Sequence, residues 1–291
     1  LFRLKKYINR FINITLIIMK NIETEYEKLI EEILEAPEKD DRTGTGTRSV
    51  FGRNITHGMQ HGYPLLSGKR IYHNHALVEL LWILNGRTDL QYLHNNGVKY
   101  WDADYKRSGR TDGNLGPVYG HQWRSFNGVD QLANLVADIK SNPTSRRLMV
   151  NAWNPVDIPN MVLPPCHYGF QVYINEGKLS LMWQQRSADV FLGLPYDIAM
   201  YGALLEMLAK GAGLEPGELI GQLGDCHLYS NHIKQAKEYL KRSKSYKFPK
   251  LVMNESLRYV KGKLFIPRLN NLAVLNYNPL PAIPAPLSVG N

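Results

Sequence analysis

The sequence predicts an α+β fold in a single domain. Segments with helical periodicity and segments with strand-like alternation follow one another irregularly, without the strict strand–helix–strand rhythm of a parallel α/β protein. No internal repeat, low-complexity segment or linker divides the 291 residues. Of these residues, 44% are hydrophobic and 21% are charged, which is typical of a globular chain and excludes disordered, collagen-like and coiled-coil proteins.

Residues 1–18 are predicted to be an extension of doubtful function, and residues 19–291 to form the domain. The extension carries four basic residues and no acid, and an apolar stretch, FINITLIIM, follows them. This order resembles a weak signal peptide, but no small-residue cleavage site comes after it. The apolar stretch is far shorter than the roughly 20 residues of a membrane-spanning helix, so we expect no membrane partner.

Helical signals dominate the first part of the domain. Thr24 and Glu27 form a capping box, and the apolar residues after them recur at helical spacing until Ala36. A polar loop with two glycines is expected over residues 41–47. The mostly apolar segment 76–84 is expected to be a helix that ends at Asn85-Gly86.

The middle of the chain is expected to be rich in strands. Residues 102–117 are charged and contain several glycines, which favours a loop, and residues 132–139 have the spacing of an amphipathic helix. A turn is expected over residues 175–178. Strands are expected over residues 148–153, 170–174 and 179–186.

The last third combines a buried helix, a surface helix and an extended tail. Residues 198–209 are apolar nearly all round, which is typical of a buried helix. Residues 231–241 are expected to form a helix on the surface. The tail is expected to be extended because prolines recur at positions 279, 281, 284 and 286.

The net charge of +9 invites a nucleic-acid hypothesis, but the distribution of the charge weakens it. The four basic residues of the extension account for almost half of it, and no run of five basic residues occurs. Elsewhere the positive charge is spread or placed singly inside motifs. We therefore expect pockets for small anions and no nucleic-acid partner.

The two cysteines are too few for a disulfide framework, which favours a reducing, cytoplasmic compartment. Cys166 lies in LPPCH, where two prolines stiffen the backbone and His167 follows. A neighbouring imidazole and a nearby arginine would favour the thiolate, which is the nucleophilic form. A buried structural thiol is the alternative. Cys226 has no Cys-x-x-Cys partner and is interpreted as structural.

Several arginines lie near glycine-containing loops and strand ends, where they could bind a phosphate dianion. Any one of them could instead be a solvated surface charge. Ser187 could add a hydroxyl group to such an anion site. The arginines are Arg42, Arg146, Arg147 and Arg186.

Three further side chains have two interpretations each. Glu79 lies within an apolar helix, where burial would raise its pKa and let it shuttle protons, or it lies on the wet face of that helix. His227 and Tyr229 are two residues apart, so in an extended segment both project to one side and could bind a sugar hydroxyl. The histidines lack the usual companion ligands of a metal ion, so no metal is expected.

Taken together, these motifs resemble thymidylate synthase. The resembling segments occur in the family's order and cover nearly everything after residue 20. They are DRTGTGTRSVFG (41–52), ELLWILNG (79–86), GNLGPVYGHQWRSF (113–126), SRRLMVNAWNP (145–155), LPPCHYGFQVY (163–173), QRSADVFLGLPYDIAMY (185–201), LEPGELIGQLGDCHLYSNH (214–232) and NYNPLPAIPAPLSV (276–289).

The resemblance implies a catalytic domain built on a twisted mixed sheet with flanking helices, and a homodimer packed through that sheet. It implies a pyrimidine nucleoside monophosphate as substrate and 5,10-methylenetetrahydrofolate as co-substrate. Cys166 would attack carbon 6 of the pyrimidine, and carbon 5 would then capture the one-carbon unit. Glu79 would run a proton network with Tyr119 and His167 nearby.

The resemblance also implies the binding residues. Trp101 and the tail up to Val289 would cover the folate. The other assignments are Arg42, Arg186 and Ser187 for the phosphate, Arg146 and Arg147 for the partner subunit's phosphate, His227 and Tyr229 for the ribose, and Asp189 within the nucleotide site.

Asp197 is the departure that bears on the substrate. The family carries Asn here, and its amide donates to oxygen 4 of uracil and accepts from the ring N–H. Cytosine reverses this edge, which suits a carboxyl group that accepts from the amino group and, when protonated, donates to the ring nitrogen. An ionised Asp opposite oxygen 4 costs about 1–3 kcal/mol. Asp is the pattern of the related cytidylate hydroxymethylases, whereas a water or a protonated Asp197 would rescue uracil.

Two smaller departures bear on the product. The family's tail usually stops at the residue matching Val289, but Gly290 and Asn291 follow here. Asp104 stands where many members carry a second Trp near the folate. Both favour a wetter site, in which water rather than hydride would capture the exocyclic methylene and give a hydroxymethyl group.

The leading hypothesis is therefore 5-hydroxymethylation of dCMP or CMP. Reductive methylation of dUMP to dTMP with release of dihydrofolate is the alternative, and hydroxymethylation of dUMP is the third. A non-catalytic RNA-binding homologue is a different class of protein. The joint presence of Cys166, Glu79, Arg186 and His227 argues against it, because a binding protein needs no nucleophile.

Overall fold

A mixed six-stranded sheet organises the structure, a computed structural model that describes residues 21–288. The strand order is β1-β2-β6-β5-β4-β3. β5 and β6 run parallel and the other neighbours antiparallel, so the α+β class is confirmed. The extension over residues 1–18 and the tail residue Val289 lie outside the described residues. The strands are β1 (Glu38–Lys39), β2 (Thr47–Gly58), β3 (Met149–Asn151), β4 (His167–Asn175), β5 (Lys178–Asp189) and β6 (Glu215–Tyr229).

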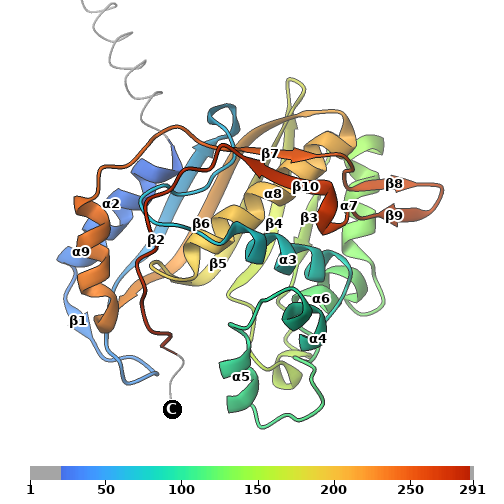
Figure 1. Ribbon diagram of the computed structural model, residues 1–291. Helices are drawn as coiled ribbons and strands as arrows, with labels where there is room; N and C mark the ends of the chain where they lie inside the picture. Colours follow the sequence, from blue (N-terminus) through green and yellow to red (C-terminus); the bar gives the residue numbers. More distant parts are fainter. Residues whose placement is uncertain (1–20, 289–291) are drawn as a thin grey trace, which may run out of the picture.

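Helices pack against one face of this sheet (Figure 1). α8 (Leu194–Ala212) lies on β5 and β6, and α3 (His73–Leu84) packs on α8. α2 (Ile22–Glu35) contacts β2 and α9 (Ile233–Lys241). Apart from short 3-10 helices, the remaining elements are α4 (Leu90–Asn95), α5 (Asp102–Arg107), α6 (Tyr119–Ser125), α7 (Gln131–Ser141), and two small sheets of β7 (Lys250–Met253) with β10 (Leu272–Leu275) and β8 (Arg258–Val260) with β9 (Lys263–Phe265).

The core lies between the sheet and α8. Alternate residues of β5, among them Leu181 and Trp183, are fully buried on the covered face, as the two-residue period of a strand requires. Trp183 stacks on Tyr201 of α8, with ring centroids 5.3 Å apart. The α8 sequence is apolar nearly all round because the sheet covers one of its sides and α3 the other.

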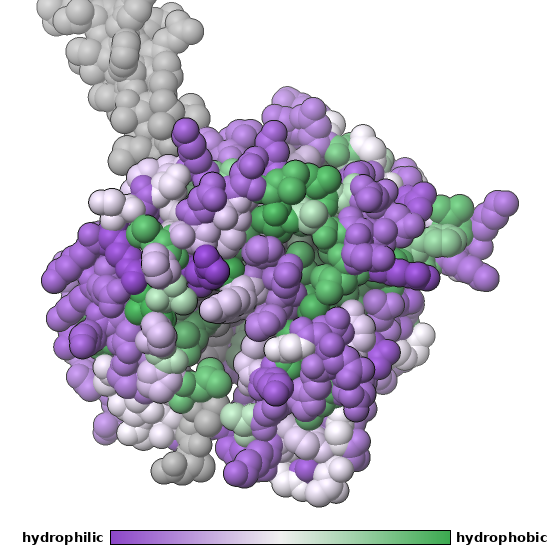
Figure 2. Space-filling model, viewed as in Figure 1, coloured by the Kyte–Doolittle hydropathy of each residue, from purple (hydrophilic) through white to green (hydrophobic). Residues whose placement is uncertain are grey.

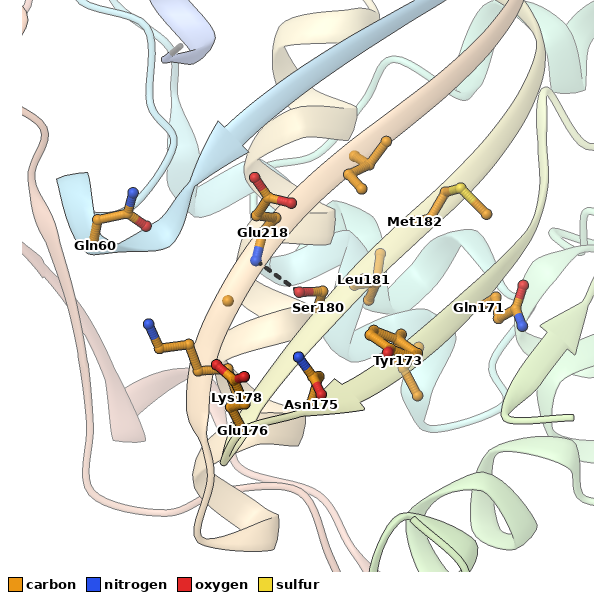
Figure 3. Close-up of a pocket in the computed structure, with 13 residues that line it drawn as sticks. Gln60, Gln171, Tyr173, Asn175, Glu176, Lys178, Ser180, Leu181, Met182 and Glu218 are labelled. Carbon is orange, nitrogen blue, oxygen red and sulfur yellow. Dashed lines mark hydrogen bonds between the residues drawn. The ribbon is translucent and has the colours of Figure 1, made fainter. Parts of the chain in front are cut away.

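The opposite face of the sheet is open over β4, β5 and β6 (Figure 3). A hollow of about 620 Å³ lies there, lined in part by Tyr173, Met182 and Ile220. Tyr173 is 66% exposed, and Phe51, which lines a second hollow with Tyr168, is 78% exposed. Large apolar side chains gathered on an open face are typical of a surface that another protein covers.

The C-terminal tail runs back over the molecule without helix or strand from Asn276 to Ser288. The Tyr277 hydroxyl donates to Leu66 O at 2.9 Å, and the Leu280 N–H donates to Ser67 O at 2.8 Å. Further along, His232 Nε2 bonds Pro286 O at 2.7 Å. The expected extended tail is therefore confirmed over its described part, and side chains distant in sequence fix its course.

Most expected elements are present, and two expectations are wrong. Residues 102–107 form α5 where a loop was expected, because acidic residues in its first turn and basic residues in its last complement the helix dipole. The capping residue of α2 is Asn21, whose side chain accepts from Thr24 N–H, so the helix begins a turn before the Thr24 capping box. No strand was predicted over β2 or β6. Between residues 21 and 288, no helix is long and apolar enough to cross a membrane.

Candidate active site

Cys166 directly precedes β4 and is held by backbone contacts on both sides. Its N–H donates to the Tyr119 hydroxyl at 2.9 Å, and its carbonyl accepts from Arg186 N–H at 2.8 Å. The Arg186 guanidinium donates to Pro165 O at 2.9 Å and Pro164 O at 3.0 Å. The carbonyls of the two prolines thus hold the Arg186 guanidinium close to the segment that carries the thiol.

The charge state of the thiol differs from the expectation. Burial raises the pKa of Cys166 to about 11, although Arg186 and Arg42 act to lower it. His167 supplies no positive charge, because burial lowers the pKa of its imidazole to about 3. The expected contribution of the neighbouring imidazole to the thiolate is therefore wrong, and only the arginines favour the nucleophilic form.

Glu79 points from α3 towards two aromatic donors. Tyr100 Oη donates to Glu79 Oε2 at 2.6 Å, and Trp101 Nε1 donates to Oε1 at 2.7 Å. Burial raises the pKa of Glu79, and these two bonds partly offset the rise. Glu79 is thus an enclosed, hydrogen-bonded carboxyl group, as a residue that shuttles protons in a closed site would be. Tyr100 could not be found from the sequence, because no pattern distinguishes it from any other half-buried tyrosine.

Asp197 lies in the first turn of α8 and takes one hydrogen bond. Gln185 Nε2 donates to Asp197 Oδ2 at 2.8 Å, while Gln185 Oε1 accepts from Trp183 Nε1 at 3.0 Å. An indole nitrogen only donates, so this contact fixes which end of the Gln185 amide faces Asp197. Gln185 was not predicted as a site residue, although a polar residue at an inward position of β5 is a signal for one.

The pKa of the Asp197 carboxyl group is strongly raised. Burial raises its pKa to about 8, and repulsion by Glu79 and Asp189 adds to the rise, whereas the Gln185 bond lowers it. A carboxyl group with a pKa above 7 is mostly protonated at pH 7, and in that form it carries one donor and one acceptor oxygen. His167 Nε2 lies 3.9 Å from Asp197 Oδ1.

A stack of rings joins these groups. The Tyr119 and His167 rings are stacked with centroids 4.3 Å apart, and His167 Nδ1 lies 2.9 Å from the Tyr201 hydroxyl. Tyr119 also feels the charge of Glu79. Glu79 therefore acts on Tyr119 at one end of this stack, but its direct hydrogen bonds go to Tyr100 and Trp101.

The parallel pairing of β5 and β6 brings the nucleotide-site residues together. Ser187 pairs with Asp225 and Asp189 with His227. His227 and Tyr229 project to one side, with ring centroids 5.1 Å apart. Burial raises the pKa of Tyr229 to about 12. Smaller effects come from Asp189, Asp41 and Cys166, which raise this pKa, and from Arg42, which lowers it.

The predicted anion ligands fall into two groups. Arg42 and Arg186 lie near enough to Cys166 for their charges to lower the pKa of its thiol. Arg146 and Arg147 are exposed just before β3, and neither guanidinium bonds another residue within 21–288. A single chain thus brings Arg42 and Arg186 to the thiol, whereas the guanidinium groups of Arg146 and Arg147 have no hydrogen-bond partner among the described residues.

Cys226 is fully buried on β6, which agrees with a structural role. Within the described part of the chain, no group of three or more His, Cys, Asp and Glu side chains is placed to hold a metal ion.

The face seen in Figure 2 is hollowed near its centre, where hydrophobic residues line an otherwise polar surface.

The arrangement combines a thiol beside two arginines, two enclosed carboxyl groups and a His–Tyr pair, a set suited to covalent catalysis on a small anionic ring compound. The sequence model of a family described as thymidylate synthase matches residues 24–289. Members are enzymes of folate-dependent one-carbon transfer to carbon 5 of a pyrimidine nucleotide, with methylenetetrahydrofolate as co-substrate. Because the match spans nearly the whole chain, this protein belongs to the thymidylate synthase family.

Proposed function

We propose that the protein 5-hydroxymethylates a cytidine monophosphate, dCMP or CMP. The observation that carries this proposal is the enclosed carboxyl group of Asp197, whose pKa of about 8 keeps it neutral at pH 7. Its carbonyl oxygen can accept from the amino group of cytosine, and its hydroxyl can donate to the unprotonated ring nitrogen. Both polar positions of the cytosine edge are then satisfied.

Cytosine also tolerates a shift of the proton. Its ring nitrogen is basic, so the proton can move from Asp197 to the base and leave both hydrogen bonds in place. Oxygen 4 of uracil is a much weaker base, and an ionised Asp197 would face it as a second acceptor. That mispairing costs about 1–3 kcal/mol, a factor of about ten to a hundred in affinity.

The neutral carboxyl group also supports a second candidate, reductive methylation of dUMP to dTMP. In that case the hydroxyl of Asp197 donates to oxygen 4 and its carbonyl accepts from the ring N–H of uracil. This pairing needs the proton to stay on Asp197, and it is lost above a pH of about 8. Hydroxymethylation of dUMP is the third candidate.

In the proposed reaction Cys166 attacks carbon 6, and the proton held between Asp197 and the ring nitrogen offsets the charge that develops on the ring. Arg186 and Arg42 beside the thiol favour its ionised form and bind the phosphate. The nucleotide is positioned further by Ser187, Asp189, His227 and Tyr229.

The residues present fit a bound folate, which supplies the one-carbon unit. Trp101 offers an aromatic surface beside Glu79. The buried Nδ1 of His232 has no hydrogen-bond partner among residues 21–288, although Asp189 Oδ1 lies 3.9 Å away, near where the tail crosses at Pro286. A polar ring or an ordered water would satisfy it. The tail up to Val289 would cover the folate.

After carbon 5 has captured the one-carbon unit, water is proposed to add to the exocyclic methylene, because charged groups lie near the thiol. Asp104 pairs with Arg107 at 2.5 Å, and Asp104 acts on the pKa of Cys166. A carboxylate with its arginine holds water where an indole would exclude it. This surrounding favours a hydroxymethyl over a methyl product.

The active form is proposed to be a homodimer packed through the open face of the sheet. The apolar hollow around Tyr173 and Met182 lies on that face (Figure 3). Arg146 and Arg147 are exposed next to the same sheet, at β3. A second chain would give the two arginines a phosphate to bind. We further propose one catalytic domain over residues 19–291 and a cytoplasmic location.

One assay tests the substrate and product together. The protein is incubated with methylenetetrahydrofolate and, in separate reactions, with dUMP, dCMP or CMP, and the products are weighed by mass spectrometry. Hydroxymethylated cytidylate is the expected product. Turnover of dUMP alone to dTMP would overturn the Asp197 argument, and no product from any nucleotide would favour the RNA-binding class.

A further inference from the structure

The two enclosed carboxyl groups of the site differ in the donors that surround them. Glu79 receives hydrogen bonds on both oxygens, from Tyr100 at 2.6 Å and from Trp101 at 2.7 Å. Asp197 receives one, from Gln185 at 2.8 Å. The groups interact, because the charge of Glu79 raises the pKa of Asp197. Two carboxyl groups that repel each other in an enclosed site share a proton unequally.

We propose that Tyr100 is a positioning residue that keeps this proton on Asp197 and leaves Glu79 ionised. The inference deepens the proposed function and rests on it for its catalytic consequence. An ionised Glu79 can take a proton during the reaction, while a neutral Asp197 can give one to the base.

The two donors of Glu79 act differently. Trp101 Nε1 can only donate, so it holds Oε1 in place. The Tyr100 hydroxyl can donate or accept, and its bond to Oε2 is strongest when Glu79 is ionised, because a charged acceptor strengthens a hydrogen bond. Tyr100 also lies beside α8, with its ring centroid 6.2 Å from that of Tyr196, the neighbour of Asp197 in sequence.

No positive charge competes for this role. Among the described residues, no lysine or arginine bonds either carboxyl group, and the lowered pKa of His167, about 3, keeps its imidazole neutral. The neutral donors of Tyr100 and Trp101 therefore decide which carboxyl ionises. The titratable or polar groups that face the pair from the packed elements are Tyr119, Cys166, His167, Gln185, Asp189 and Tyr201.

The test is the pH dependence of kcat/KM in wild type and in Tyr100→Phe. Loss of the hydroxyl raises the pKa of Glu79, so the acidic limb of the profile moves to higher pH by about one unit, the size expected for one charge-assisted hydrogen bond. Tyr105→Phe is the matched control. Its hydroxyl accepts from Gly113 N–H, away from Glu79, so its profile coincides with wild type.

A second variant gives a shift of opposite sign and keeps the fold intact. Tyr100→3,5-difluorotyrosine has a more acidic phenol, which donates more strongly and stabilises the ionised Glu79. Its acidic limb moves to lower pH. Profiles of Tyr100→Phe and Tyr100→3,5-difluorotyrosine that both coincide with wild type would overturn the proposal.

A readout without substrate separates this inference from the proposed function. Infrared difference spectra of the free protein, with Glu79→Gln to identify the carboxyl band, follow the titration of Glu79 directly. The band should titrate at higher pH in Tyr100→Phe. If wild type turns over no nucleotide, the proposed function fails while the titration still tests Tyr100; unchanged titration in an active enzyme refutes Tyr100 alone.

Discussion

The base end of the site and its phosphate end are built differently. At the base end, Glu79, His167 and Asp197 are each held by side-chain hydrogen bonds within one chain. At the phosphate end, Arg42, Arg146 and Arg147 are exposed and hold no ion pair within residues 21–288. Folding alone thus prepares the base end, whereas the phosphate end needs the substrate and, as proposed, a second chain. Variants at the first should change selectivity and stability, and variants at the second should change affinity.

Cys166 lies where the two ends meet, so its loss should remove activity entirely. Cys166→Ser is expected to lower kcat by about a thousandfold or more, because a serine hydroxyl without an activating base is a poor nucleophile at carbon 6. Cys226→Ala is the matched control and keeps wild-type kcat. Substantial turnover by Cys166→Ser would refute the nucleophile assignment.

Asp197 tests whether the base end sets selectivity. Asp197→Asn should shift the ratio of kcat/KM for cytidylate and uridylate towards uridylate by about ten- to a hundredfold, because the amide donates to oxygen 4 and accepts from the ring N–H. Competition of dCMP against dUMP in one reaction measures the ratio. An unchanged ratio would mean that Asp197 does not read the base.

The same variant tests the stability of the base end. The pKa of Asp197 rises on folding, from about 4 to about 8. The free energy of unfolding therefore falls as pH rises from about 4 to about 8, because the folded protein keeps a proton that the unfolded chain releases. Asn does not titrate, so Asp197→Asn should gain about 1–3 kcal/mol of unfolding free energy at pH 8 relative to pH 4. Urea unfolding at both pH values measures this gain. A gain of the same size at both would contradict the neutral Asp197.

The phosphate end should give a smaller effect of another kind. Arg147→Gln is expected to weaken nucleotide binding about tenfold, the value of one charge-assisted contact, and to leave the unfolding free energy unchanged. Calorimetric titration measures the affinity. Mixing this variant with inactive Cys166→Ser chains should restore sites in which Cys166 and Arg147 come from different chains. An affinity equal to wild type would place Arg147 outside the site.

The residues of the candidate site were easier to predict from the sequence than the central strands of the sheet that positions them. Local patterns predicted α3, α7, α8 and the β4–β5 hairpin, because helix period, alternation and turn residues are encoded locally. Strands β2 and β6 were not predicted, since their pairing joins residues some 170 positions apart and their glycines mask the alternation. Hydrogen-bond partners such as Tyr100 and Gln185 also escaped, because only the folded chain brings them to Glu79 and Asp197.

The course of the tail governs how this protein can be handled in the laboratory. Hydrogen bonds join the tail residues Leu280, Pro281 and Pro286 to Ser67, Arg242 and His232, respectively. The last described segment of the tail is therefore anchored on the side that would cover the folate. Coupling to a chip or resin through the C-terminus would pull on these anchors. We expect such immobilised protein to lose folate affinity while keeping its affinity for the nucleotide, so attachment through an exposed lysine of β8–β9 is the better design.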